Sequence, residues 1–117
     1  MHIPTTQLPL ETIMIHVIAK ITTVPGKRPD VLTAFLANVP AVLAEKGCIE
    51  YQPVIDAKQG TDFQSDLGDD TFIVVEKWAT LDDLQAHAKS EHMAAYGATV
   101  KGMIADRAVH VLENYSQ

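Results

Sequence analysis

Apolar and polar residues alternate from Ile15 to Thr22, which is the period-two pattern of a half-buried β-strand. The segment Val24-Pro25-Gly26 follows and carries two residues that interrupt regular structure. The apolar positions of this first predicted strand are Ile15, Val17, Ala19 and Ile21. We therefore predict a strand over residues 15–22 that ends at a turn.

A longer stretch with apolar residues at three-four spacing follows and predicts an amphipathic helix from Pro29 to Ala44. Pro29 stands where a first helical residue is favoured, and Pro40 is expected to bend the helix. Lys46 and Gly47 then give a helix-stop signal. The apolar positions of the helix are Val31, Leu32, Phe35, Leu36, Val39, Val42 and Leu43.

Two further strands are predicted over residues 48–55 and 71–79. Pro53 places the first of them at a sheet edge or a bulge, and the second is rich in β-branched and aromatic residues. The polar stretch from Asp56 to Asp70 between them contains two Gly and five Asp. It lacks the residue order of an EF-hand calcium loop, so we interpret it as a solvated hairpin loop.

Helical signals return after Thr80, which forms a capping box with Asp83. Ser90 provides a second cap, and apolar residues at helical spacing continue to Ile104, so we expect two helical pieces here. A last strand is predicted over residues 107–115. The resulting order, βαββαβ, is that of a ferredoxin-like α+β two-layer sandwich.

The chain has 117 residues, of which 47% are hydrophobic and 21% charged, as expected for an ordinary globular domain. We divide it into an N-terminal arm, residues 1–13, and one domain, residues 14–117. The net charge of −6 is spread without a basic cluster, which argues against a nucleic acid or an anionic membrane as partner. Cys48 is the only cysteine and no apolar run has the length of a spanning helix, so the cytoplasm is the expected location.

The predicted strand over residues 71–79 is apolar on both faces. Its alternate residues form two sets, Phe72, Val74 and Trp78, and Ile73, Val75 and Ala79. Two helices cover only one face of a four-stranded sheet, and an exposed apolar face is rare on a soluble monomer. We therefore expect a homodimer in which two sheets pack face to face. The alternative is that residues 1–13 fold over that face.

Five short segments between residues 14 and 115 form a recognisable combination. They are Val24-Pro25-Gly26-Lys27, GCIEY from Gly47, FIVVEKW from Phe72, and LQAH from Leu84 followed by SEHM from Ser90. In these segments the chain resembles the antibiotic biosynthesis monooxygenase family. The resemblance implies a dimeric α+β barrel that oxidises an electron-rich aromatic or quinol substrate with molecular oxygen, often without metal, flavin or haem. We accordingly expect no cofactor.

The resemblance singles out Trp78 and His92 as catalytic residues. Trp78 ends its strand, where the indole could form a pocket wall and donate its N–H to a substrate oxygen; a purely structural core role is the alternative. His92 stands at a helix start, where the helix dipole favours the neutral imidazole that a general base requires. A surface or capping role is the alternative for His92. If His92 is the base, its replacement by Ala should abolish turnover and leave folding intact.

Four further residues are assigned to the lining of the substrate pocket: Tyr51, His87, Met93 and Tyr96. Packing is the favoured alternative for His87, a structural role or a dimer contact for Tyr51, and the core for Met93 and Tyr96. Glu76 is expected to form a salt bridge or to orient a histidine. The spacing of His87 and His92 does not place two metal ligands on one helix face, so we expect no metal site.

Other functions stay open. Haem-degrading relatives need an Asn on the first strand and a haem-binding His on the later helix, where this chain has residues 19–21 and Tyr96. An isomerase on the same fold would need an anion site, and Lys20, Lys101 and Arg107 are too scattered in sequence to define one. A non-catalytic dimer that binds a small ligand in the same pocket is the remaining alternative.

Overall fold

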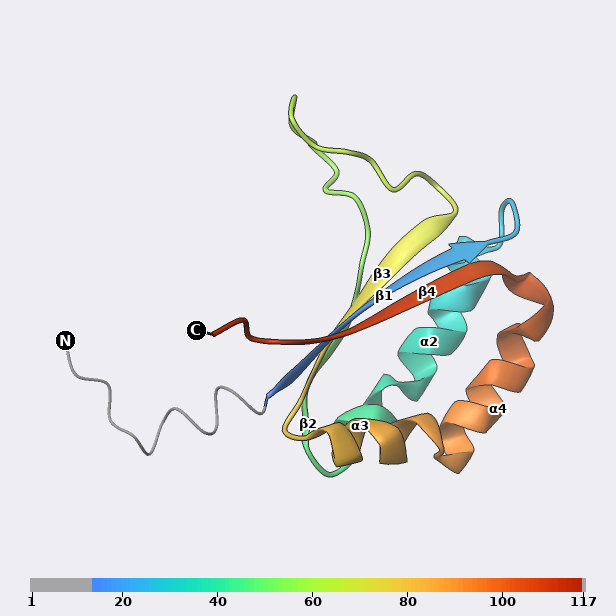
Figure 1. Ribbon diagram of the computed structural model, residues 1–117. Coiled ribbons are helices and arrows are strands. Elements are labelled where there is room, and N and C mark those ends of the chain that lie inside the picture. Colours follow the sequence, from blue (N-terminus) through green and yellow to red (C-terminus); the bar gives the residue numbers. More distant parts are fainter. Residues whose placement is uncertain (1–13, 117) are drawn as a thin grey trace.

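A computed structural model of the chain describes residues 14–116. The interpretation of residues 1–13 as an arm lies outside the described residues, as does Gln117. The elements, shown in Figure 1, are β1 (Ile15–Thr23), α2 (Arg28–Leu43), β2 (Cys48–Val54), β3 (Thr71–Trp78), α3 (Leu81–Ala88), α4 (Glu91–Val100), a short 3-10 helix (Lys101–Met103) and β4 (Ile104–Glu113).

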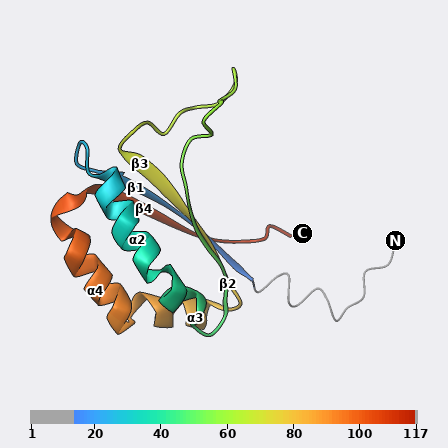
Figure 2. The same ribbon diagram turned by 180° about the vertical axis from the view of Figure 1, so that it is seen from behind.

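The four strands form one antiparallel sheet in the order β2-β3-β1-β4. Figures 1 and 2 show all three α-helices on the same side of this sheet. The predicted ferredoxin-like α+β sandwich is thereby confirmed, including the division of its second helical region into α3 and α4. Both predicted caps are present, because the side chains of Thr80 and Ser90 accept the backbone N–H groups of Asp83 and Met93.

The core lies between the sheet and the helices. Along β1 the odd-numbered residues are buried and the even-numbered ones are partly or fully exposed, so the predicted alternation holds over the whole strand. Register places Val17 between Glu76 of β3 and Val111 of β4, and these three side chains therefore share the helix-side face. Phe35 of α2 packs edge-on against Phe72 of β3, with ring centroids 6.0 Å apart.

The last strand begins at Ile104, and our predicted start at Arg107 was three residues too late. The backbone N–H of Val24 donates to the carbonyl of Met103 at 2.9 Å, which holds this segment beside the end of β1. The pairing also shifts register between Thr22 and Thr23. Met103 and Ile104 fit the helical spacing by sequence, but this hydrogen bond and the pairing of Ile104 with Thr23 extend the strand toward α4.

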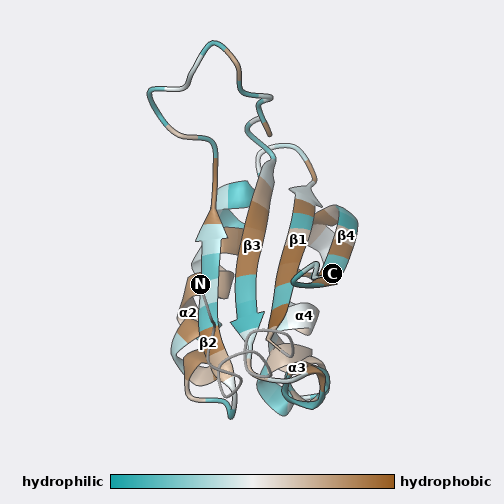
Figure 3. Cartoon of the chain, turned by 60° about the vertical axis from the view of Figure 1, so that its left-hand side comes forward, coloured by the Kyte–Doolittle hydropathy of each residue, from teal (hydrophilic) through white to brown (hydrophobic). Residues whose placement is uncertain are grey.

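The face of the sheet that points away from the helices carries a strip of apolar side chains. No helix among the described residues covers this face (Figure 3). Within the strip, Ile18, Ile73 and Val75 are half-buried, while Val54 and Leu112 are 38% and 46% exposed. Within residues 14–116 the structure has no helix with the length and apolar character needed to cross a membrane.

Candidate functional site

A cavity of about 650 Å³ lies between the helix-side face of the sheet and helices α3 and α4. Most of its lining is apolar, with Val17, Ala19 and Val74 contributed by the central strands. On the edge strand β4, Val109 and Val111 also line the cavity but are 44% and 49% exposed. The cavity is therefore open along β4.

The opposite end of the cavity is buried and polar. His87, in the last turn of α3, is only 4% exposed, and its Nδ1 lies 2.7 Å from Oε2 of Glu45. A carboxylate oxygen can only accept, so Nδ1 carries the proton in this hydrogen bond. In the neutral imidazole this leaves Nε2 as a proton acceptor, and among residues 14–116 nothing bonds to it. The arrangement is that of an oriented base.

Two local features bring Glu45 to His87. Gly47 has a φ of +80°, and its missing side chain leaves room for Asp83 of α3, into which any Cβ would collide. The chain can therefore turn sharply from α2 into β2 with α3 packed against the turn. On the other side, the hydroxyl of Ser90 donates to the carbonyl of His87 at 2.8 Å and fixes the junction between α3 and α4.

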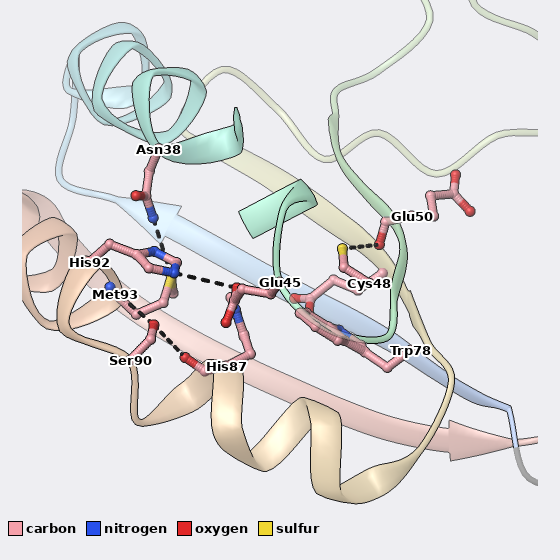
Figure 4. A network of polar contacts seen from close by, with 10 residues as sticks. Asn38, Glu45, Cys48, Glu50, Trp78, His87, Ser90, His92 and Met93 are labelled. Carbon is pink, nitrogen blue, oxygen red and sulfur yellow. Dashed lines mark hydrogen bonds and ion pairs between the residues drawn. The ribbon is translucent and has the colours of Figure 1, made fainter. Parts of the chain in front are cut away.

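His92 and His87 both lie beside the carboxylate of Glu45 (Figure 4). Nε2 of His92 is 3.5 Å from Oε2 of Glu45, which is ion-pair distance, and neither of the buried ring nitrogens of His92 makes a hydrogen bond to the described residues. The residue does not line the large cavity. It lines a separate groove of about 310 Å³ between α2 and α4, together with Asn38 and Tyr96. Glu45 is thus shared by both histidines.

Trp78 is fully buried and lies beneath His87, with ring centroids 4.7 Å apart. It does not line the cavity. Its indole N–H, which we expected to reach a substrate oxygen, donates to Oε1 of Glu76 at 2.9 Å. Glu76 is 7% exposed and does line the cavity, and burial raises the pKa of its carboxyl group. Trp78 can therefore influence the cavity through Glu76.

The four residues assigned to the pocket all line the cavity: Tyr51, His87, Met93 and Tyr96. Tyr51 stacks on Phe35 with ring centroids 5.0 Å apart and meets His87 edge-on at 5.4 Å. Burial raises the pKa of Tyr51 far above its usual range and that of Tyr96 to about 12. Both phenols are consequently neutral at physiological pH and can serve as hydrogen-bond donors.

Glu45 was not predicted from the sequence to be a site residue. It is separated from His87 by 42 positions, and no motif spacing connects a glutamate after one helix with a histidine on another. Arg107 and Lys101, which are scattered in the sequence, line the same cavity in the structure. Within residues 14–116, no group of three or more His, Cys, Asp or Glu side chains has an arrangement that could hold a metal ion.

Sequence comparison relates this chain to proteins of known family. The profile of the family "Antibiotic biosynthesis monooxygenase" matches residues 14–99. The protein named "Probable quinol monooxygenase YgiN" from Escherichia coli K12 is 39% identical over 102 residues, which cover 86% of this chain and 97% of the relative.

Solved structures share the fold at lower sequence identity. A conserved protein from Methanosarcina mazei superimposes with a TM-score of 0.77 at 16% identity, covering 92% of this chain and 99% of that one. PA3566 from Pseudomonas aeruginosa gives a TM-score of 0.73 at 20% identity, covering 91% and 98%. These two structures show the fold alone, whereas the profile match and the Escherichia coli relative also show the family. The chain belongs to the antibiotic biosynthesis monooxygenase family.

Proposed function

We propose that this chain is a monooxygenase that oxidises a small aromatic or quinol substrate with molecular oxygen and without metal, flavin or haem. The observation that carries the proposal is an oriented imidazole, His87 on Glu45, at the buried end of a largely apolar cavity. The name of the Escherichia coli relative supports a quinol as the substrate class. A cavity of about 650 Å³ is ample for an aromatic molecule of one or two rings.

The proposed reaction needs no reductant other than the substrate. His87 Nε2 takes a phenolic proton, and the resulting phenolate passes one electron to oxygen. The substrate radical and superoxide then combine, which forms a carbon–oxygen bond at the ring. His87 then returns its proton to the outer oxygen of the bound peroxide, and the oxygen–oxygen bond breaks. The outer oxygen leaves as water, which also takes the hydrogen of the attacked carbon. One quinol and one oxygen molecule thus give one hydroxyquinone and one water.

The two residues singled out by sequence have indirect roles in this proposal. His92 shares Glu45 with His87 and so helps to set the position and charge of that carboxylate. Trp78 supports the ring of His87 and holds Glu76 through its N–H. Both are positioning residues here, whereas the sequence-based hypothesis makes His92 itself the base. The two hypotheses predict different orders of activity loss.

The test is oxygen uptake with a panel of hydroquinones, corrected for spontaneous oxidation and measured with a metal chelator present. His87→Ala should lower kcat by about a hundredfold or more, the usual contribution of a general base. His92→Ala should lower it by about tenfold, because the base remains. Lys58→Ala, at an exposed position in the loop between β2 and β3 and outside the cavity lining, is the control and should retain wild-type activity.

Isotopically labelled oxygen separates this reaction from simple oxidation. One labelled atom should appear in the organic product and one in water; label in hydrogen peroxide alone would indicate a quinol oxidase instead. The reverse order of loss, with His92→Ala inactive and His87→Ala active, would assign the base to His92. No uptake from the wild type would favour the ligand-binding dimer or the isomerase.

We also propose that a second copy of the chain covers the apolar strip of Ile18, Ile73 and Val75. The support is the uncovered apolar face itself, since a strip of this kind is rare on a monomer. Light scattering should give twice the mass of the chain, and a monomer at micromolar concentration would contradict the proposal. Val75→Asp should shift the mass toward the monomer, because it places a charge inside the expected contact.

A further inference from the structure

The open end of the cavity is basic, in contrast to the chain as a whole. Lys101 and Arg107 line it, and within residues 14–116 neither forms an ion pair with a carboxylate. The chain carries 15 acidic against nine basic residues, so two unpaired cations in one largely apolar cavity are not what its average composition predicts. Among residues 14–116, Glu76 is the only acidic residue of the lining, and it lies at the other end.

Strand register separates the two ends of the cavity. Arg107 pairs with Ile21 on one side of β1, and Glu76 pairs with Val17 on the other side. The four residues from Val17 to Ile21 span about 13 Å along the strand, and two strand spacings add roughly 10 Å across it. Both side chains line the cavity, and the charge of Arg107 partly opposes the raised pKa of Glu76, so the gap between the charged groups is shorter than this backbone separation and is of the order of one ring with a short side chain.

Tyr96 links the basic end to the aromatic wall. It lines the cavity and packs edge-on against Phe35, with ring centroids 5.9 Å apart. Arg107 lines the same cavity as Tyr96, and its positive charge partly opposes the rise in the pKa of Tyr96 that burial causes. Arg107 and the neutral Tyr96 can therefore both donate hydrogen bonds to one acidic group.

We infer that the preferred substrate is an aromatic or quinol that carries a carboxylate on a short side chain. The ring lies at the His87 end, and the carboxylate lies against Arg107 with Lys101 beside it. A guanidinium suits a carboxylate because its planar donors can form two parallel hydrogen bonds. This inference rests on the proposed function, since it names the substrate class of the same cavity.

The experiment compares two matched probes, 3-(2,5-dihydroxyphenyl)propanoic acid and its primary amide, which differ in charge and hardly in shape. The wild type should favour the acid by about tenfold in kcat/KM, mainly through KM. Arg107→Gln should lower kcat/KM for the acid much more than for the amide and so bring the two probes to near equality. Arg107→Lys should be intermediate, because it keeps the charge and loses the bidentate geometry.

Lys58→Gln is the control, because it removes one exposed positive charge in the loop between β2 and β3, away from the cavity. It should keep the preference for the acid. Raising the salt concentration should weaken the preference in the wild type, as expected for a partly exposed ion pair. A wild type with no preference, or an Arg107→Gln variant that keeps it, would overturn the inference.

A binding measurement separates failure of this inference from failure of the proposed function. If both probes are turned over equally, the result supports the proposed monooxygenase activity and rejects the carboxylate site. If neither probe consumes oxygen, thermal unfolding with each probe decides. A larger rise in Tm with the acid that Arg107→Gln abolishes would support the site without the activity, whereas equal shifts would reject both.

Discussion

The two ends of the cavity are built by opposite means. At the buried end, the polar side chains Glu45, Glu76 and His87 are enclosed and bonded to one another or to Trp78, whose ring is fully buried. At the open end, Val109 and Val111 of β4 are 44% and 49% exposed, although they point to the same face of the sheet. The first end therefore holds its polar groups in fixed hydrogen bonds, whereas the second leaves its side chains exposed.

The difference also predicts where the fold is sensitive. A buried hydrogen-bonded group loses packing and leaves a partner unpaired when it is replaced, whereas a half-exposed group loses little. Substitutions at the buried end should therefore cost several times more stability than substitutions on β4.

Trp78→Ala is expected to have the largest effect on stability. It removes the largest fully buried side chain, opens a cavity beneath His87, and deprives Glu76 of its donor. The loss in free energy of unfolding should be about 3–5 kcal/mol, measured by urea denaturation. Trp78→Phe removes the N–H and part of the ring but keeps most of the volume, so its loss should be smaller; equal losses would mean that the hydrogen bond dominates.

Glu45→Ala should have the next largest effect, because it leaves the buried Nδ1 of His87 without a partner. We expect a loss of about 2 kcal/mol from the unpaired donor. Glu50→Ala is the matched control, since Glu50 pairs with Lys77 at 3.5 Å where both side chains are about 40% exposed. A surface pair of this kind contributes below about 1 kcal/mol. A similar loss in both variants would show that the contact of Glu45 with His87 contributes no more to the free energy of unfolding than a surface ion pair.

Glu76→Gln tests the buried carboxyl through the pH dependence of stability. Burial is the main cause that raises the pKa of Glu76, and the Trp78 N–H and the charges of His87 and Arg107 oppose it. Since the folded-state pKa is above the unfolded one, this group stabilises the fold most at pH values below the unfolded pKa. That contribution is lost as the pH rises through the folded pKa.

The corresponding measurement is Tm between pH 4 and pH 7 for the wild type and Glu76→Gln. The Tm of the wild type relative to the variant should be highest at the acidic end and should decrease toward neutral pH. A difference that stays constant or grows with pH would contradict a raised pKa. The variant keeps a carbonyl oxygen for the N–H of Trp78, so the comparison isolates the ionisation.

The fold was largely predictable from sequence because its signals are local. The alternation in β1 and the caps at Thr80 and Ser90 involve residues close together in the chain, and each is present in the structure. The start of β4 was missed because a contact with Val24, far away in sequence, decides it.

The site was predictable only in part. The four residues assigned to the pocket were named from their positions on a predicted strand and on the later helices, and they line the cavity; their contact with a substrate stays a prediction. Glu45 and the hydrogen bond between Trp78 and Glu76 could not be foreseen in this form. The first depends on a turn at Gly47 and the packing of α3. The hydrogen bond of Trp78 depends on whether its indole N–H donates to a neighbouring carboxylate or to a substrate, and the spacing of residues in the sequence does not decide between the two.

Val111→Ala should have the smallest effect and gives the sharpest comparison, because Val111 and Val17 are direct partners in the sheet and share one face. Val17 is 1% exposed and Val111 49%. Val17→Ala should therefore cost about 2 kcal/mol through lost burial and the cavity left behind, while Val111→Ala should cost below about 0.5 kcal/mol. Urea denaturation of both variants measures this. Equal losses would mean that something covers the inner face of β4 in solution, and repetition at tenfold dilution would then identify a second copy as the cover if the loss at Val111 shrinks.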